Sequence, residues 1–289
     1  MTSRFAARRQ RFRALLDGPQ CIHPASVFDP MSARVAEDLG FEAGMLAGST
    51  ASLAVLGAPD NITLTLSEFA GLAQRICRAG ELPLMVDADH GYGNALNVMR
   101  AVEELQAAGV AAISIEDTLL PRAFGAGGGA LLNSLEEGVG KMRAAVKARG
   151  AGPMAIFGRT SAVAISGVDD TIRRLKAYEE AGVDALFVPG IKTRDELDQI
   201  ADAVCLPIIL GGCSESLADM PYLASRKVRI WLGGHQAFAA AVQAMYDTLK
   251  AVRAGARPSE LANIAPEALM ARLTRSADYQ ADTKDYLGG

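Results

Sequence analysis

One phrase recurs along the chain and constrains its fold more than any other feature. It is a helix-like stretch, then a glycine, an apolar residue and a short apolar strand, and it occurs at Asp38–Ala43, Ala107–Ala112 and Glu180–Ala185. A glycine directly after a helix can adopt the left-handed conformation that closes the last turn. Each phrase therefore predicts a joint at which a helix ends and the chain re-enters a sheet.

Eight apolar segments of strand length are predicted, near residues 21–28, 43–48, 84–89, 112–116, 155–159, 185–189, 207–211 and 229–233. Helical patterns fill the intervals, for example over 95–108, 136–149, 169–181, 194–203 and 236–254. Uniform alternation of strands and helices predicts a parallel sheet, and eight units in one chain predict a closed (β/α)₈ barrel of the α/β class. The alternative is an open doubly wound sheet, but no G-x-G-x-x-G motif opens a helix after the first strand.

The chain of 289 residues suits one such barrel, whose usual length is about 250 residues. We therefore expect a single domain over residues 1–289. Residues from about 255 to 289 contain two prolines followed by polar residues and predict a helical tail. Its apolar positions need a surface to cover, either on the same subunit or on a neighbouring one.

Composition excludes several classes of function. A net charge of −4 gives no basic footprint for nucleic acid, and no apolar run is long enough to span a membrane. The four cysteines show no metal-ligand spacing, so we expect reduced thiols and a cytoplasmic protein. The basic start, with Arg4, Arg8, Arg9, Arg11 and Arg13, predicts a leading amphipathic helix; an organellar presequence is the alternative.

Acidic side chains follow two neighbouring strands. Asp87 and Asp89 end the third predicted strand, where residues two apart point the same way, and Glu116 ends the fourth. Parallel neighbours would bring the three carboxylates together, which is costly unless a cation joins them. Hard oxygen ligands without a His/Cys cluster favour Mg²⁺, with Mn²⁺ as a second choice. Alternatively, each acid caps a following helix or turn.

Other predicted strands also end in polar groups. Arg159 ends the fifth strand and could hold a substrate carboxylate, or could pair with one of the acids instead. Ser49 and Thr50 follow Gly48 and offer hydroxyl and backbone N–H donors. His235 follows a Gly-Gly pair after the last strand and is a candidate substrate contact, although a lone histidine is often structural. The glycine-dense loop 121–133 predicts a mobile lid or a surface loop without a role.

At these residues the chain resembles the phosphoenolpyruvate mutase/isocitrate lyase superfamily. The likeness rests on Ala25–Arg34, Asp87–Gly93, Ile115–Asp117, Gly158-Arg159 and the glycine-rich end of the eighth strand. The resemblance implies a barrel whose eighth helix is exchanged between subunits, in dimers that pair into homotetramers. It also implies Mg²⁺ held by the positions matching Asp87, Asp89 and Glu116, with Asp60 as an acid one step removed from the ion.

Two departures narrow the expected activity. Lyases of this superfamily carry a catalytic cysteine after the fourth strand, and the phosphonate enzymes place Lys and Asn there; Pro121–Gly125 has none of these. The remaining motif, with His90 and His235, most closely resembles the oxaloacetate decarboxylase branch. That resemblance implies Mg²⁺-dependent decarboxylation of oxaloacetate to pyruvate and CO₂ through a chelated enolate. From their positions at the strand ends we expect Arg159 and His235 to be catalytic residues, and both to bind substrate together with Gly48, Ser49 and Thr50.

Two alternatives stay open. One is a lyase or hydrolase acting on another 2-oxo or 2-hydroxy acid, such as a 2-methylisocitrate-like or phosphonopyruvate-like substrate. The other is a dicarboxylate-binding protein without catalytic activity.

Overall fold

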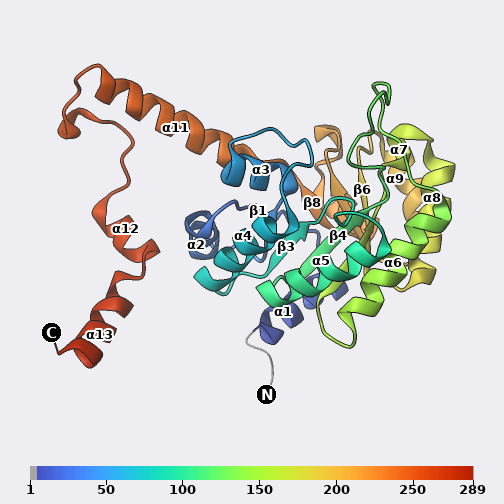
Figure 1. Ribbon diagram of the computed structural model, residues 1–289, viewed down its shortest axis with the longest axis horizontal. Helices are drawn as coiled ribbons and strands as arrows, with labels where there is room; N and C mark the ends of the chain where they lie inside the picture. The colour runs from blue at the N-terminus through green and yellow to red at the C-terminus, as the bar shows by residue number, and fades with distance from the viewer. Residues whose placement is uncertain (1–4, 289) are drawn as a thin grey trace.

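The computed structural model describes residues 5–288. Eight parallel strands form one curled sheet, and their order in the sheet is their order along the chain (Figure 1). The strands are β1 (Ala25–Ser26), β2 (Gly44–Leu46), β3 (Leu84–Asp87), β4 (Ala112–Glu116), β5 (Ala155–Arg159), β6 (Ala185–Pro189), β7 (Ile208–Gly211) and β8 (Val228–Leu232). The predicted α/β class and the eight parallel strands are confirmed.

The first predicted strand is much shorter than expected. Ile22 bridges to β8, with its N–H donating to the Arg229 carbonyl and its own carbonyl accepting from the Trp231 N–H, both at 2.9 Å. Residues 25 and 26 are in register with β2, and the Val27 N–H donates to the Met45 carbonyl of β2 at 2.9 Å. Pro24 lies between the two contacts and has no N–H to donate, so the chain forms two short pairings in place of one continuous strand over 21–28. Together these pairings join the first and last strands.

Helices follow the strands as the alternation predicts. They are α1 (Ala6–Asp17), α2 (Pro30–Asp38), α3 (Gly48–Leu56), α4 (Leu66–Ala79), α5 (Ala95–Ala108), α6 (Leu135–Arg149), α7 (Ala162–Ile165), α8 (Val168–Ala181), α9 (Arg194–Ala203), α10 (Met220–Ser225), α11 (Gln236–Arg253), α12 (Glu267–Leu273) and α13 (Ser276–Leu287). The glycines of the recurrent phrase have φ of 81° at Gly40, 99° at Gly109 and 89° at Gly182. These left-handed conformations confirm the three predicted joints.

The core has two layers that follow from the period of two along each strand. Met85, Phe157 and Ile209 point inward and fill the barrel, whereas Val86, Ile156 and their equivalents point outward against the helices. Helix α1 lies below the barrel (Figure 1), where the ring of Phe12 is 6.0 Å from that of Phe157. The amino-terminal helix therefore closes the end of the barrel opposite the carboxyl ends of the strands.

The arginines of α1 bind backbone carbonyls at this lower end. The Nε atom of Arg9 donates to the Val110 carbonyl at 2.8 Å, and that of Arg13 donates to the Pro153 carbonyl at 2.7 Å. Arg8 is 1% exposed and pairs with Glu81 at 3.0 Å. The basic residues at the start of the chain thus belong to a folded helix and donate hydrogen bonds to carbonyls of the barrel floor. Arg4 lies outside the described residues.

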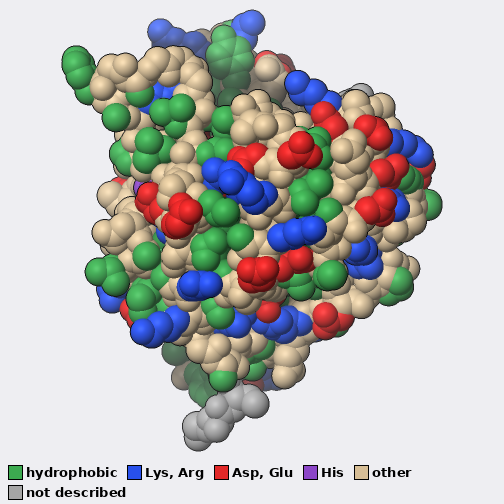
Figure 2. Space-filling model, turned by 90° about the vertical axis from the view of Figure 1, so that its right-hand side faces the viewer, with side chains coloured by type: hydrophobic (Ala, Val, Ile, Leu, Met, Phe, Trp, Pro, Cys, Tyr) green, Lys and Arg blue, Asp and Glu red, His purple; other side chains and the backbone are tan. Residues whose placement is uncertain are grey.

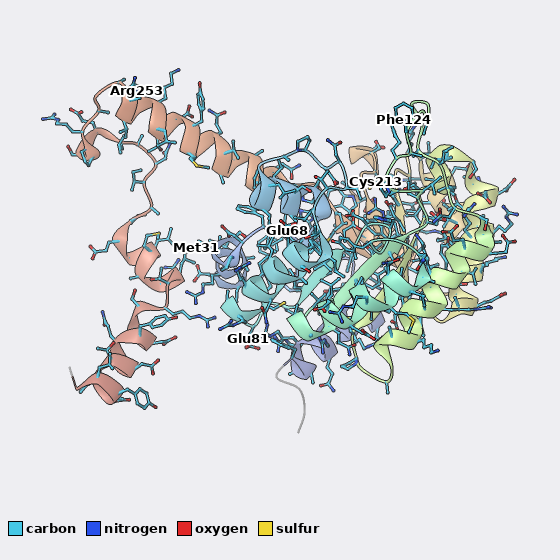
Figure 3. The ribbon with its side chains drawn as sticks, viewed as in Figure 1. Met31, Glu68, Glu81, Phe124, Cys213 and Arg253 are labelled. Carbon is cyan, nitrogen blue, oxygen red and sulfur yellow. The ribbon has the colours of Figure 1, made fainter. Side chains whose placement is uncertain are left out.

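The carboxyl-terminal helices leave the barrel. Helix α11 projects outward from β8, with Arg253 at its far end, and none of its residues is buried (Figures 1 and 3). Helix α12 returns to α2, where Arg272 binds Asp38 at 2.8 and 3.0 Å and Arg34 donates to the Leu273 carbonyl at 3.0 Å. The tail therefore covers part of α2, while α11 leaves its apolar side chains uncovered.

The surface carries charges of both signs. On the face shown in Figure 2, Lys and Arg side chains alternate with Asp and Glu, and no field of one sign dominates. Within residues 5–288, no helix is both long and apolar enough to cross a lipid bilayer.

Candidate active site

Strands β3 and β4 place the acids at one end of the barrel. Asp87 is the last residue of β3, and its Oδ1 accepts from the Ser114 hydroxyl at 3.0 Å. The expected strand stops there: Asp89 lies in a turn, with a left-handed φ of 47°, because its carbonyl turns to accept from the Glu116 N–H at 2.8 Å. The prediction that both aspartates lie on one strand is therefore wrong. Both side chains nevertheless line the same cavity.

This cavity has a volume of about 440 Å³ and lies at the carboxyl ends of the strands. One side is acidic and is formed by residues on or after β2, β3 and β4. The opposite side comes mainly from β6, β7 and β8 and is apolar or glycine except for His235. The described lining residues are Met45, Ala47, Ser49, Asp60, Ile62, Asp87, Asp89, Glu116, Leu120, Arg159, Phe187, Pro189, Gly211, Gly212, Leu232, Gly234 and His235. It brings together all three predicted metal ligands and Asp60.

Arg159 stands between the two sides. It ends β5 opposite Glu116 in the parallel register, so its guanidinium pairs with Asp87 and, at 3.1 Å, with Glu116. Its carbon Cζ lies 5.1 Å from the centre of the Phe187 ring. The predicted pairing with the acids is therefore confirmed, and the binding of a substrate carboxylate by Arg159, which also lines the cavity, stays a prediction.

Burial and like charges perturb the acids. The pKa of Asp89 is raised well above its usual range, first by burial and then by the nearby charges of Asp87, Asp60 and Glu116. Burial also raises the pKa of Glu116, although Arg159 opposes this shift. Four carboxylates face one guanidinium in the cavity, so the ionised site has a deficit of positive charge that a divalent cation would relieve.

The acidic side of the cavity offers oxygen ligands for a metal ion. Within residues 5–288, no group of three or more His, Cys, Asp or Glu side chains is arranged closely enough to hold an ion. The donors are nonetheless the hard oxygens that Mg²⁺ prefers, and two of them are turned to Arg159. The chemistry of the donor set therefore fits Mg²⁺.

Helix α3 begins at the cavity. Gly48 leaves room for the Asp89 carboxylate, because a Cβ at this position would lie 2.8 Å from Asp89 Oδ1. Ser49 lines the cavity. Thr50 corrects an expectation: its buried hydroxyl donates to the Ala47 carbonyl at 3.0 Å, so only its backbone N–H is available. The first-turn N–H groups of α3 have no partner within the helix and suit an anionic oxygen.

His235 lies at the other end of the cavity, directly before α11. Its Nδ1 is 2.8 Å from the Ser26 hydroxyl, which orients the ring and is a partner that the sequence did not predict. Burial lowers the pKa of His235, with a smaller opposing effect from Asp87, so the ring is neutral near pH 7. His90, by contrast, is buried and does not belong to the cavity lining.

Sequence reasoning missed a buried charged network behind β4. Asp117 is fully buried, and its Oδ2 accepts from Arg174 at 3.0 Å and from the Tyr178 hydroxyl at 2.6 Å. Arg174 also donates to the Asn133 carbonyl at 3.1 Å, at the end of the glycine-dense loop. The signal in the sequence was an arginine and a tyrosine spaced four apart on the inward face of a helix.

The fold and the cavity together define a barrel protein of the (β/α)₈ kind, with an acid-lined site at the carboxyl ends of its strands. The sequence model of the family described as phosphoenolpyruvate phosphomutase matches residues 12–253. The chain belongs to this family, as its motifs predicted.

Similar sequences and solved structures agree with this family assignment. A protein of Bradyrhizobium sp. (strain BTAi1 / ATCC BAA-1182) named oxaloacetate decarboxylase is 54% identical over 283 residues, which are 98% of each chain. The phosphoenolpyruvate phosphomutase structure from Streptomyces platensis subsp. rosaceus has a TM-score of 0.86 and 27% identity, over 96% of this chain and 99% of the other. A phosphonopyruvate hydrolase complex with oxalate and Mg²⁺ has a TM-score of 0.84 and 30% identity, over 97% and 99%.

Proposed function

We propose that this protein catalyses the Mg²⁺-dependent decarboxylation of oxaloacetate to pyruvate and CO₂. The observation that carries the proposal is the division of the cavity into an acidic side and an apolar side, with Arg159 between them. The 54% identical relative named oxaloacetate decarboxylase supports the activity. The neighbouring structure that contains oxalate and Mg²⁺ supports a divalent ion and a small dicarboxylate in a site on this fold.

Asp87, Asp89 and Glu116 would hold Mg²⁺, or Mn²⁺, and Asp60 would accept hydrogen bonds from water around the ion. When bound, the ion supplies positive charge that stabilises the negative charge developing on the 2-oxo oxygen as the C3–C4 bond breaks. Arg159 keeps the two acids in place and binds the carboxylate next to the 2-oxo group. Ser49 and the N–H groups at the start of α3 orient the same end of the substrate.

The distal carboxylate then faces the apolar side. Among the described lining residues, Arg159 is the only Lys or Arg, and Phe187, Pro189 and Leu232 offer no hydrogen-bond donor from their side chains. A carboxylate beside these groups loses hydration without gaining a partner, whereas CO₂ carries no charge. The cavity thereby favours loss of this carboxylate. A proton must reach C3 of the enolate, and water is its proposed source.

His235 contacts the substrate as a neutral imidazole held by Ser26. The loop 121–133 closes the cavity in this proposal. Leu120 already reaches the cavity, and Phe124 at the tip of the loop is fully exposed (Figure 3). The loop contains neither Cys nor Lys, and decarboxylation requires neither because no alkoxide leaves and no phosphorus is attacked.

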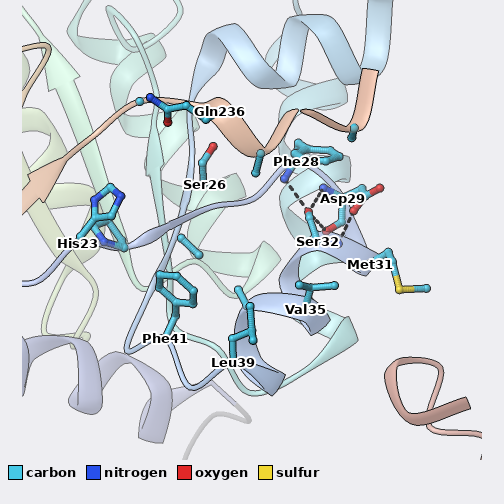
Figure 4. A pocket seen from close by; sticks show the side chains of 16 residues that line it. His23, Ser26, Phe28, Asp29, Met31, Ser32, Val35, Leu39, Phe41 and Gln236 are labelled. Carbon is cyan, nitrogen blue, oxygen red and sulfur yellow. Dashed lines mark hydrogen bonds between the residues drawn. The ribbon is translucent and has the colours of Figure 1, made fainter. Parts of the chain in front are cut away.

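The assembly proposed is a homotetramer built from two dimers that exchange α11. An apolar cavity of about 600 Å³ lies along α2 and the segment around β1, lined by Phe28, Met31, Val35, Leu39 and Phe41 among others (Figure 4). On α11, Val242, Met245, Tyr246, Leu249 and Val252 are 45–63% exposed. In the proposed dimer, the exposed apolar side chains of α11 from a second copy would cover the cavity along α2. Light scattering after size-exclusion chromatography tests this assembly. The cytoplasmic location and the single domain over 1–289 stay predictions from the sequence.

The decisive experiment offers the purified protein oxaloacetate, methylisocitrate and phosphonopyruvate with Mg²⁺ and measures pyruvate and CO₂. A reaction without enzyme and one with EDTA correct for decarboxylation by free metal. The proposal requires EDTA-sensitive release of pyruvate and CO₂ in equal amounts from oxaloacetate. Pyruvate together with a second organic fragment would indicate a lyase, and pyruvate together with inorganic phosphate would indicate a phosphonopyruvate hydrolase. Mg²⁺-dependent binding of oxalate without turnover would indicate a binding protein.

A further inference from the structure

A lysine occupies a core position of α6. The inward face of this helix consists of Gly138, Lys141, Met142 and Ala145, which follow the spacing of a buried helical stripe. Lys141 is 2% exposed. A lysine is rarely this buried unless its ammonium group has a partner.

The partner lies beside the acidic turn. Lys141 Nζ donates to the backbone carbonyl of His90 at 3.0 Å, directly after Asp89. This stretch is unusual in its backbone: φ is 47° at Asp89, 77° at Gly91 and 63° at Tyr92. Left-handed conformations are unfavourable for residues with a side chain and persist only where the surroundings hold them. The ammonium group is one such restraint from outside the turn.

The charge environment supports a link between Lys141 and the site. Burial lowers the pKa of Lys141, and the negative charges of Glu137, Glu116 and Asp117 oppose that shift. Lys141 therefore lies within electrostatic range of Glu116, which ends β4 in the cavity. It belongs to neither the cavity lining nor the proposed chemistry.

We propose that Lys141 is a positioning residue for the Mg²⁺ site, fixing the His90 carbonyl so that the Asp89 carboxylate stays directed into the cavity. This inference rests on the proposed metal site. Groups that orient metal ligands from behind typically change metal affinity by about 10- to 100-fold when removed. Loss of Lys141 should therefore weaken Mg²⁺ binding about 10-fold.

Two physical effects of removing the amine have opposite signs, which makes the inference testable. Loss of the hydrogen bond frees the turn and weakens Mg²⁺ binding. Loss of a nearby positive charge removes repulsion and strengthens it. Positioning therefore predicts a higher dissociation constant, and a purely electrostatic role predicts a lower one.

The experiment is calorimetric titration of Mg²⁺ into EDTA-stripped, dialysed protein, with circular dichroism to verify folding. Lys141→Met keeps most of the apolar stem, and Lys147→Met is a matched control because Lys147 lies on the same helix and is more accessible. We expect a dissociation constant about 10-fold higher for Lys141→Met and an unchanged one for Lys147→Met. Lys141→Gln, whose side chain is too short to reach the His90 carbonyl, should show the same loss and decides the matter if the Met variant does not fold.

An unchanged or lower dissociation constant in a folded Lys141 variant overturns the inference, even if the variant melts at a lower temperature, because that result indicates a structural role alone. Absence of Mg²⁺ binding by the wild-type protein is a different outcome. It would refute the proposed metal site itself, together with everything that rests on it.

Discussion

The substitution Tyr178→Phe measures how strongly the buried carboxylate of Asp117 depends on its donors. Tyr178 and Asp117 are both fully buried, and the hydroxyl donates to Asp117 Oδ2 at 2.6 Å. A hydrogen bond to a charged group contributes about 1.5–3 kcal/mol to stability. Because Arg174 remains as a second donor, we expect the free energy of unfolding to fall by about 2 kcal/mol. In a domain of this size 1 kcal/mol corresponds to about 2 °C, which gives a fall in Tm of about 4 °C.

The assay is urea unfolding in EDTA, followed by circular dichroism. Tyr246→Phe is the control, because Tyr246 is 63% exposed and should lose almost no stability. Arg174→Met should cost more, about 3–5 kcal/mol, because it leaves a buried charge unpaired. Adding Asp117→Asn to Arg174→Met should then recover part of that loss. A Tyr178→Phe cost below about 0.5 kcal/mol, or no recovery in the double variant, would refute the view that an ionised Asp117 is held by these two donors.

Further predictions concern the cavity and pH. Gly48→Ala should cost more free energy of Mg²⁺ binding than free energy of unfolding, because its Cβ would meet Asp89 Oδ1 at 2.8 Å. Calorimetry measures the first quantity and thermal melting the second. Asp87→Ala should abolish EDTA-sensitive pyruvate release, and near-normal release would contradict the ligand assignment. Leu232→Lys would give the distal carboxylate a charged partner and should lower kcat about 10-fold or more while lowering KM, with Leu232→Met as the control. Burial lowers the pKa of His90 to about 4. Between about pH 6.5 and 4 the His90 ring then stays neutral in the folded protein without metal, whereas it takes up a proton in the unfolded chain. The free energy of unfolding should therefore fall as the pH drops over this range, by at most about 1.4 kcal/mol per pH unit. His90→Gln should flatten this slope.

Much of the site was predictable because barrels bring the carboxyl ends of their strands to one face. Asp87, Asp89, Glu116, Arg159 and His235 could be grouped because each lies at or just after the end of a predicted strand. How they meet could not be predicted. The turn at Asp89 and the pairing of Arg159 with two acids depend on strand register and on contacts between residues 27 to 72 positions apart.

The sequence by itself determined the elements, since glycines at helix ends, apolar periodicity and the residues that cap helices act within a few positions of each other. It therefore predicted where helices end and how many strands alternate with them. Only the tertiary structure decided that the predicted first strand breaks at Pro24, that the arginines of α1 bind carbonyls of the barrel floor, and that Lys141 lies behind the acids. The reason is physical: a charge on a buried helix face is tolerable only if a distant part of the chain supplies its partner, and packing of the closed barrel alone brings that partner near.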